Sequence, residues 1–220
     1  MLTRVLETEV MDTLEEARDY NAMDHSEVNR LFVDDLLAAG PLQGEVLDLG
    51  TGTALIPVEL CKRNEEVRVV AVDLAVQMLD LARYNVEVEV LTERIMLDHI
   101  DAKELPYEEG RFAAVISNSI VHHIAQPARV MSEAARVLAA GGLIFFRDLL
   151  RPADEVAVQQ LVETYATDEN EHARGMFAAS LRAALRLDEV RQLVQEAGFD
   201  PQTVQITSDR HWTCIARKEE

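Results

Sequence analysis

A short apolar strand that runs into a glycine turn is the feature that most constrains the fold of this chain. Residues 45–49 read Glu-Val-Leu-Asp-Leu, and Gly50 and Gly52 follow at once. Glycines let the backbone turn without a Cβ clash, and a helix that starts after the turn presents unpaired N–H groups to a ligand. The pattern predicts a strand, a ligand-binding turn and a helix that Thr53 caps through its hydroxyl.

Two classes of cofactor use such a turn, and Asp48 favours one of them. A dinucleotide fingerprint needs a third small residue at a fixed place, which is missing here. The Asp48 carboxylate would repel a pyrophosphate and attract an ammonium group. This charge indicates S-adenosylmethionine, which carries an amine and a cationic sulfur. An NAD(P)-dependent oxidoreductase remains an alternative.

A second acid strengthens this interpretation. Residues 67–72 form another apolar strand that closes on Asp73, where a carboxylate can accept hydrogen bonds from both ribose hydroxyls. Acids at the ends of two consecutive strands are a more specific signal than the two glycines alone.

Several stretches of the chain resemble the class I S-adenosylmethionine-dependent methyltransferases, in their small-molecule branch. They are residues 47–53, 70–74, 98–107, 112–118 and 141–146, with Ala54 in place of the usual third glycine. The resemblance implies an α/β fold: a Rossmann-like three-layer sandwich whose mostly parallel seven-stranded sheet ends in an antiparallel hairpin. It also implies that Asp101 and the N–H of Ala102 hold the adenine.

The organisation along the chain predicts one domain, residues 1–220. A helical cap is expected at 1–40, with helices at 1–20 and from Ser26, and a cofactor-binding core at 45–148. In that core, alternating strands and helices predict a parallel sheet, and a helix from Pro127 is expected to end at Gly141-Gly142. Residues 151–186 form a lid or an ordinary helical excursion, and 187–217 a last helix and a hairpin.

Ligands of an open parallel sheet bind beyond the carboxyl ends of its strands. The candidate cofactor-binding residues there are Tyr20, Asp48, Gly50, Thr51, Gly52, Thr53, Asp73, Leu74, Asp101, Ala102 and Asn118. Tyr20 could equally be a packing residue at a helix end. The candidate catalytic and substrate-binding residues are His122, His123, Arg147, Asp148, Arg210 and His211, with Arg151 just beyond.

Each substrate-side residue has a plainer alternative. His122 and His123 could be packing residues, Arg147 and Asp148 a structural ion pair, and Arg210 a solvated charge in the hairpin turn. No histidine and carboxylate pair stands out as a general base, and no metal site is expected.

Net charge limits the class of substrate. With 40 acids against 21 basic residues the chain carries −19, which disfavours nucleic acid and anionic membrane partners and favours a small polar or anionic metabolite. Cys61 and Cys214 have no metal-binding spacing, and we expect a cytoplasmic protein without a signal peptide or membrane helix. A catalytically silent cofactor-binding protein remains a second alternative.

Overall fold

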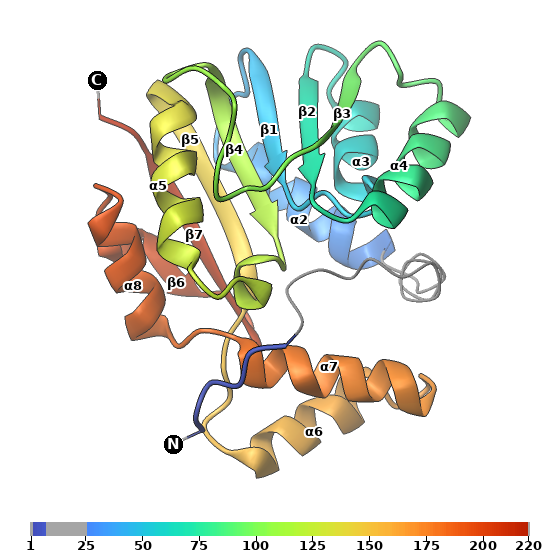
Figure 1. Cartoon of the computed structure of the whole chain (residues 1–220), viewed down its shortest axis with the longest axis vertical. Helices are drawn as coiled ribbons and strands as arrows, with labels where there is room; N and C mark the ends of the chain where they lie inside the picture. Colours follow the sequence, from blue (N-terminus) through green and yellow to red (C-terminus); the bar gives the residue numbers. More distant parts are fainter. Residues whose placement is uncertain (1, 8–25, 220) are drawn as a thin grey trace.

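A seven-stranded sheet organises the part of the chain that the structure describes, residues 2–7 and 26–219 of a computed structural model. The strands are β1 (Glu45–Leu49), β2 (Arg68–Asp73), β3 (Ile95–His99), β4 (Phe112–Asn118), β5 (Leu138–Leu149), β6 (Val204–Ile206) and β7 (His211–Arg217). Their order in the sheet is β3-β2-β1-β4-β5-β7-β6 (Figure 1). Strands β1 to β5 pair in parallel, and β7 pairs antiparallel with both β5 and β6. The predicted fold class and the terminal hairpin are confirmed.

Helices cover both faces of this sheet (Figure 1). On one face, α2 (Ser26–Ala38), α3 (Leu55–Arg63) and α4 (Val76–Val88) bury residues such as Phe32, Leu60 and Val86. On the other face, α5 (Pro127–Val137) and α8 (Leu187–Glu196) bury Met131 and Val194. Each fully buried aliphatic or aromatic side chain contributes about 1.5–3 kcal/mol by leaving water. The two apolar layers therefore hold the sheet in a three-layer sandwich.

Strand β5 feeds both layers, because successive side chains of a strand point to opposite faces. Phe145 lies on the α2 side, with its ring centroid 4.9 Å from that of Phe32. Phe146 lies on the α5 side, in the same cluster as Trp212. The same alternation continues into the polar residues at the end of β5.

A helical pair lies beyond the carboxyl end of β5 (Figure 1). It consists of α6 (Glu155–Tyr165) and α7 (Glu171–Ala183), packed through Val158, Val162 and Leu181. Residues 2–7 run beside this pair, with hydrogen bonds from the N–H of Leu2 to Ala153 O and from that of Val5 to Arg182 O. The N-terminal segment is thereby placed at the ligand end of the sheet.

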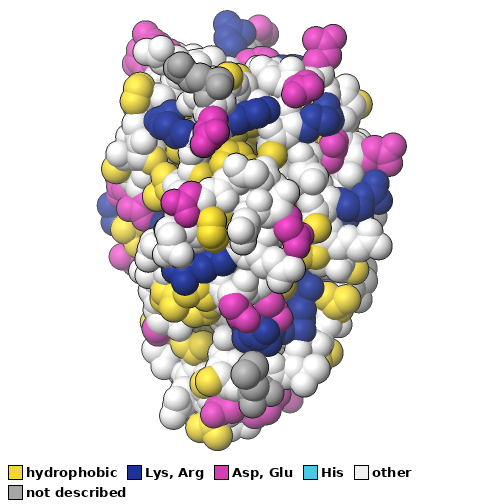
Figure 2. All heavy atoms as spheres, turned by 90° about the vertical axis from the view of Figure 1, so that its left-hand side faces the viewer, with side chains coloured by type: hydrophobic (Ala, Val, Ile, Leu, Met, Phe, Trp, Pro, Cys, Tyr) yellow, Lys and Arg dark blue, Asp and Glu magenta, His cyan; other side chains and the backbone are white. Residues whose placement is uncertain are grey.

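Charge on the face that carries α5, α8 and the β6 edge is mixed. Figure 2 shows basic and acidic side chains interspersed there, with apolar side chains between them. The described residues of this face therefore form no continuous basic stripe for a phosphate backbone.

Three local expectations were wrong. Residues 2–7 are not helical, because their backbone bonds to the α6–α7 pair; the rest of the expected first helix, including Tyr20, lies outside the described residues. Thr53 does not cap α3: the cap position is Ala54, at φ 59°, and no side chain bonds there. Helix α5 ends at Val137, before the two glycines, since β5 begins at Leu138 and the N–H of Gly141 bonds to Lys218 O.

Candidate active site

The turn after β1 is tight enough to require glycine. Gly50 and Gly52 have φ of 68° and 55°, in the left-handed region. A Cβ added to Gly50 would lie 2.0 Å from Cγ2 of Ile120. The N–H groups of Gly50 and Thr51 both donate to Val72 O at 2.9 Å, which joins the turn to the end of β2. Glycine at position 50 thus leaves room for the Ile120 side chain, and Gly50, Gly52 and Ile120 all line the pocket described below.

Asp73 braces this turn from the neighbouring strand. Its Oδ2 accepts the N–H of Gly52 at 2.7 Å, and its Oδ1 accepts that of Ala75 at 2.9 Å. Burial raises the pKa of the carboxyl group above its ordinary value, although these backbone donors oppose the rise. Each oxygen keeps a lone pair, so the carboxylate can also accept from a ligand.

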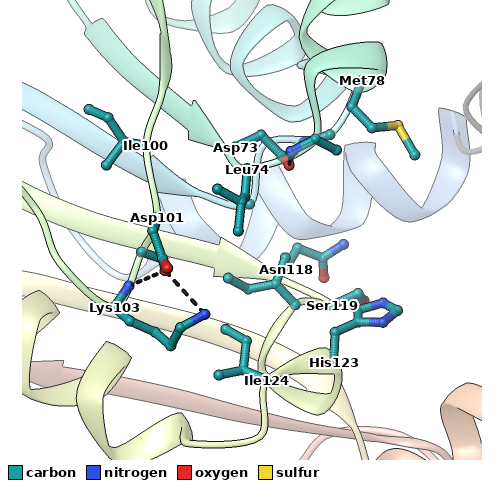
Figure 3. Close-up of a pocket in the computed structure, with 15 residues that line it drawn as sticks. Asp73, Leu74, Met78, Ile100, Asp101, Lys103, Asn118, Ser119, His123 and Ile124 are labelled. Carbon is teal, nitrogen blue, oxygen red and sulfur yellow. Dashed lines mark hydrogen bonds and ion pairs between the residues drawn. The ribbon is translucent and has the colours of Figure 1, made fainter. Parts of the chain in front are cut away.

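A pocket of about 130 Å³ opens between the ends of β1, β2, β3 and β4 (Figure 3). Its walls are mostly apolar, with a few polar groups from different strands. The lining residues are Gly50, Gly52, Asp73, Leu74, Ala75, Met78, Ile100, Asp101, Ala102, Lys103, Asn118, Ser119, Ile120, His123 and Ile124. Seven of the eleven candidate cofactor-binding residues are in this list, and so is His123.

A smaller cavity of about 20 Å³ adjoins the pocket and shares Gly50 and Asn118 with it. Its other lining residues are Asn29, Asp48, Thr51, Thr53, Leu55 and Ile56. Burial raises the pKa of Asp48 to about 7. The buried hydroxyl of Thr53 has no hydrogen-bond partner among the described residues. An ammonium group bound here would satisfy the acid, and a polar ligand atom would satisfy the hydroxyl.

Asp101 lies at the far side of the pocket, after β3. Its Oδ1 accepts the N–H of Lys103 at 2.8 Å and lies 3.2 Å from Nζ of the same residue (Figure 3). Its other oxygen and the nearby backbone are therefore placed at the pocket wall, opposite Asp73.

Asp148 and His122 form a buried pair beside the pocket. Oδ1 of Asp148 lies 2.5 Å from Nδ1 of His122, and Oδ2 accepts the N–H of Val121 at 2.6 Å. Burial alone would lower the pKa of His122, but the charge and hydrogen bond of Asp148 outweigh it and raise that pKa. Burial conversely raises the pKa of Asp148, and His122 brings it below its ordinary value. Each group thus favours the charged form of the other.

Glu7 joins this pair from the N-terminal segment. Its Oε1 lies 3.0 Å from Nδ1 of His123 and 3.5 Å from Nε2 of His122. The two imidazole rings lie with their centroids 4.0 Å apart and their planes tilted by 36°. Sequence reasoning missed Glu7, because 115 positions separate it from His122 and an acid on an expected amphipathic helix carries no signal of its own.

The substrate-side arginines lie outside the pocket. Arg147 faces α2 and pairs with Asp35 at 2.5 Å, so it does not pair with Asp148 on the opposite face. Arg151 pairs with Glu189 at 2.6 Å. The Arg210 guanidinium stacks 3.4 Å above the Tyr165 ring. These positions separate the three cations from the pocket wall.

Arg147 and Arg210 nevertheless act on one shared group, His211. Burial, together with the guanidinium charges of Arg210 and Arg147, lowers the pKa of His211 to about 4. Nδ1 of His211 contacts Oγ of Ser208 at 2.9 Å. At neutral pH this imidazole is therefore uncharged.

Comparison with known proteins decides the family. The methyltransferase domain family matches residues 47–146, which hold the glycine turn and the ends of β1 to β4. Residues 47–146 are a methyltransferase domain, and the chain has the fold of the S-adenosylmethionine-dependent methyltransferases. This match agrees with the cofactor that the sequence predicts, S-adenosylmethionine. Within the described ranges of this methyltransferase, no helix is both long and apolar enough to cross a membrane.

Curated relatives cover different parts of this methyltransferase. It is 26% identical to the 27-O-demethylrifamycin SV methyltransferase of Amycolatopsis mediterranei, over 88% of this chain and 70% of that protein. It is 35% identical to the demethylmenaquinone methyltransferase of Deinococcus radiodurans, over 56% of this chain and 50% of that protein. The chain therefore spans between half and 70% of these two relatives.

A solved structure supports the fold at low identity. Phosphoethanolamine N-methyltransferase 2 of Haemonchus contortus, in complex with S-adenosyl-L-methionine, superposes with a TM-score of 0.71. The sequences are 16% identical, and the match covers 94% of this chain and 58% of the other.

Proposed function

We propose that this methyltransferase transfers the methyl group of S-adenosylmethionine to a small polar metabolite bound beside His123. The observation that carries the proposal is one pocket with Asp73, Asp101 and Asn118 at the ends of three different strands. A nucleoside with a charged tail needs this spread of polar groups on otherwise apolar walls. The long axis of the cofactor would then run from Asp101 towards Asp48.

Each end of the cofactor has a candidate holder. Asp73 accepts the ribose hydroxyls, while Asp101 and the N–H of Ala102 hold the adenine. Asp48 binds the ammonium group in the smaller cavity. The other proposed contacts are Leu74, Asn118, Thr51, Thr53 and the glycines of the turn. Tyr20, outside the described residues, remains a proposed contact of the methionyl group.

In this proposal the protein lowers the reaction barrier mainly by positioning the acceptor. The cofactor brings an already activated methyl group on a cationic sulfur. The protein must hold the acceptor in line with it, and well-oriented groups can lower a barrier by about 7–11 kcal/mol. His123 lines the pocket and is placed to orient the acceptor or to take its proton, with His122 and Asp148 directly behind it.

The acceptor's own charge is a finer part of the proposal. Arg147 and Arg151 have close carboxylate partners, Asp35 at 2.5 Å and Glu189 at 2.6 Å. Arg210 lies 3.4 Å from Asp209, so the looser pair makes it the better candidate for an anionic group. The two curated relatives are named for demethylrifamycin and demethylmenaquinone. The first name indicates transfer to an oxygen atom, and a small molecule with an ionisable hydroxyl group is consistent with that name and with the histidines.

The test is transfer of label from methyl-labelled S-adenosylmethionine to a metabolite extract, with and without S-adenosylhomocysteine as a competitor. We expect a labelled small molecule whose formation the competitor suppresses. Binding of S-adenosylhomocysteine without any transfer would favour a silent cofactor-binding protein. Saturable binding of NADH in place of S-adenosylhomocysteine would favour an oxidoreductase. Either result overturns the proposal.

A further inference from the structure

We propose that Glu7, His122 and His123 bind one divalent transition-metal ion at the edge of the methyl-acceptor pocket. One oxygen of Glu7 and one ring nitrogen of each histidine lie within 4.8 Å of one another. Oε1 of Glu7 is 3.5 Å from Nε2 of His122 and 3.0 Å from Nδ1 of His123. Ligand bonds of about 2.0–2.2 Å to a tetrahedral ion place neighbouring ligand atoms roughly 3.3–3.6 Å apart. Small shifts of the three side chains would bring their ligand atoms to these distances.

Asp148 prepares His122 for such a role. Its carboxylate accepts the Nδ1–H of His122 at 2.5 Å, which leaves the lone pair of Nε2 on the side of Glu7. Metal-binding histidines commonly donate their second N–H to a carboxylate in this way, which fixes the tautomer and orients the ring. A lone pair that faces a carboxylate needs a cation between them, either a proton or a metal ion.

The surroundings hold the three ligands in place. Oγ of Ser180 donates to Oε1 of Glu7 at 3.1 Å. The Arg4 guanidinium donates to the carbonyl oxygens of His122 and Ile124, which fixes the loop that carries both histidines. With both histidines neutral, as metal binding requires, Arg4 contributes one positive charge here, while Glu7 and Asp148 contribute two negative ones. The local charge therefore still attracts a cation.

The type of ligand indicates the type of ion. Two imidazoles and one carboxylate suit Zn²⁺, Co²⁺, Mn²⁺ or Fe²⁺, whereas Mg²⁺ and Ca²⁺ prefer oxygen ligands. The side chains of His122, Glu7 and His123 are 4%, 18% and 18% exposed, so the cluster is enclosed but not sealed. His123 also lines the pocket, which places an open coordination position near the acceptor.

Combined with the proposed function, this site would define the acceptor more closely. A metal ion binds an oxygen and lowers the pKa of its proton. A hydroxyl group on the acceptor would then lose its proton to solvent on binding, and His123 would serve as a ligand in place of a base. This extension rests on the proposed methyl transfer, whereas the metal site itself does not.

The test begins with the whole chain, freed of metal by a chelator and titrated with Co²⁺ and, separately, with Zn²⁺. We expect one equivalent of each to bind, with visible Co²⁺ absorption of low-symmetry, tetrahedral type. Glu7→Gln and His123→Asn should each weaken binding at least tenfold, and Asp148→Asn by about 10–100-fold. His172→Asn, at an exposed histidine on α7, is the matched control and should bind as the unmodified chain does.

Binding of S-adenosylhomocysteine is measured on every variant, which shows that the sheet and its pocket are folded. Absence of a saturable Co²⁺ site in the unmodified chain overturns the proposal. So does Co²⁺ binding by Glu7→Gln and His123→Asn that is as tight as in the unmodified chain. Metal binding without methyl transfer would reject the proposed function and keep the site. Full methyl transfer by a chain that binds no metal would reject the site and keep the function.

Discussion

The carboxylate of Asp148 lies 2.5 Å from Nδ1 of His122, and it links the end of β5 to the short helical turn that follows β4. Both side chains are almost fully buried, at 1% and 4% exposed. A buried ionisable pair is costly to break, because removing one partner leaves the other charge without compensation. The pair is therefore both a structural tie and the support for the histidines beside the pocket.

We expect Asp148→Asn to lower the free energy of unfolding by about 3–5 kcal/mol, since it leaves the His122 imidazolium uncompensated. Urea unfolding of metal-free protein near pH 6 measures the change. Asp188→Asn is the control, because its carboxylate is 72% exposed and pairs at the surface with Arg186. That variant should lose no more than about 1 kcal/mol. Equal losses in the two variants would contradict the buried-pair interpretation.

The same pair predicts a pH window. The pKa of Asp148 is lowered, so its contribution is present above its ordinary pKa of about 4 and is lost as pH falls through the folded value. The pKa of His122 is raised, so its contribution is present below about 6.5 and is lost as pH rises through the folded value. The difference in unfolding free energy between the unmodified chain and Asp148→Asn should be largest between about pH 4 and 6.5. A difference that grows above that window would be inconsistent with a charged His122.

Asp73→Ala should weaken binding of S-adenosylmethionine strongly while the sheet stays folded. Each hydrogen bond from a ribose hydroxyl to this carboxylate is worth about 1.5–3 kcal/mol, and the variant also removes the brace on the Gly52 N–H. Calorimetric titration measures the affinity. Asp80→Ala, at an exposed acid of α4 that pairs with Arg83, should leave it unchanged. An unchanged affinity in Asp73→Ala would remove the ribose assignment.

Gly50→Ala should destabilise the protein by at least about 1 kcal/mol, because alanine is strained at a φ of 68°. Its Cβ would also lie 2.0 Å from Cγ2 of Ile120. Adding Ile120→Ala relieves the clash and leaves the backbone strain. The double variant should therefore recover part of the loss that the single Gly50→Ala change causes, relative to Ile120→Ala alone. Thermal unfolding of the unmodified chain, the two single variants and the double variant measures this recovery. If the stability losses of the two single changes simply add in the double variant, the turn can move away from Ile120.

Arg210→Lys should lower kcat/KM for the methyl acceptor without changing the affinity for S-adenosylhomocysteine. A lysine keeps the charge but loses the planar group that stacks 3.4 Å above Tyr165 and can grip a carboxylate or phosphate. Arg147→Lys is the comparison, because Arg147 pairs with Asp35 at 2.5 Å, more closely than Arg210 pairs with Asp209 at 3.4 Å, and its effect on the acceptor should be smaller. A larger effect at Arg147 would place the anionic group of the acceptor on the α2 side.

Much of the fold was accessible from the sequence because its signals are local. The apolar strand before Gly50, the one before Asp73 and the terminal hairpin all lie where their patterns predict them. The expected Thr53 cap failed for a reason that no pattern carries: Ala54 takes a left-handed conformation, and α3 starts one residue later than a Thr53 cap allows. The glycines at 141 and 142 looked like a helix stop, but pairing with β7 draws them into β5.

Some features of the site could likewise be predicted from the sequence, and others could not. Asp73, Asp101 and Asn118 could be placed at one edge of the sheet from sequence alone, because the ends of parallel strands meet there. Arg147 and Asp148 are consecutive in the chain, yet they take different partners, since adjacent side chains of a strand face opposite layers.

The sequence by itself determined the alternating sheet, the glycine turn and the acids of the cofactor pocket, since each depends on residues close together in the chain. Tertiary structure alone decided which partners the ionisable groups have. Asp35 reaches Arg147 from α2, and Glu7 reaches His122 and His123 across more than half of the chain. Such contacts depend on how helices and the N-terminal segment pack on the sheet. Packing of that kind follows from burying many apolar side chains at once, and no single stretch of sequence encodes it.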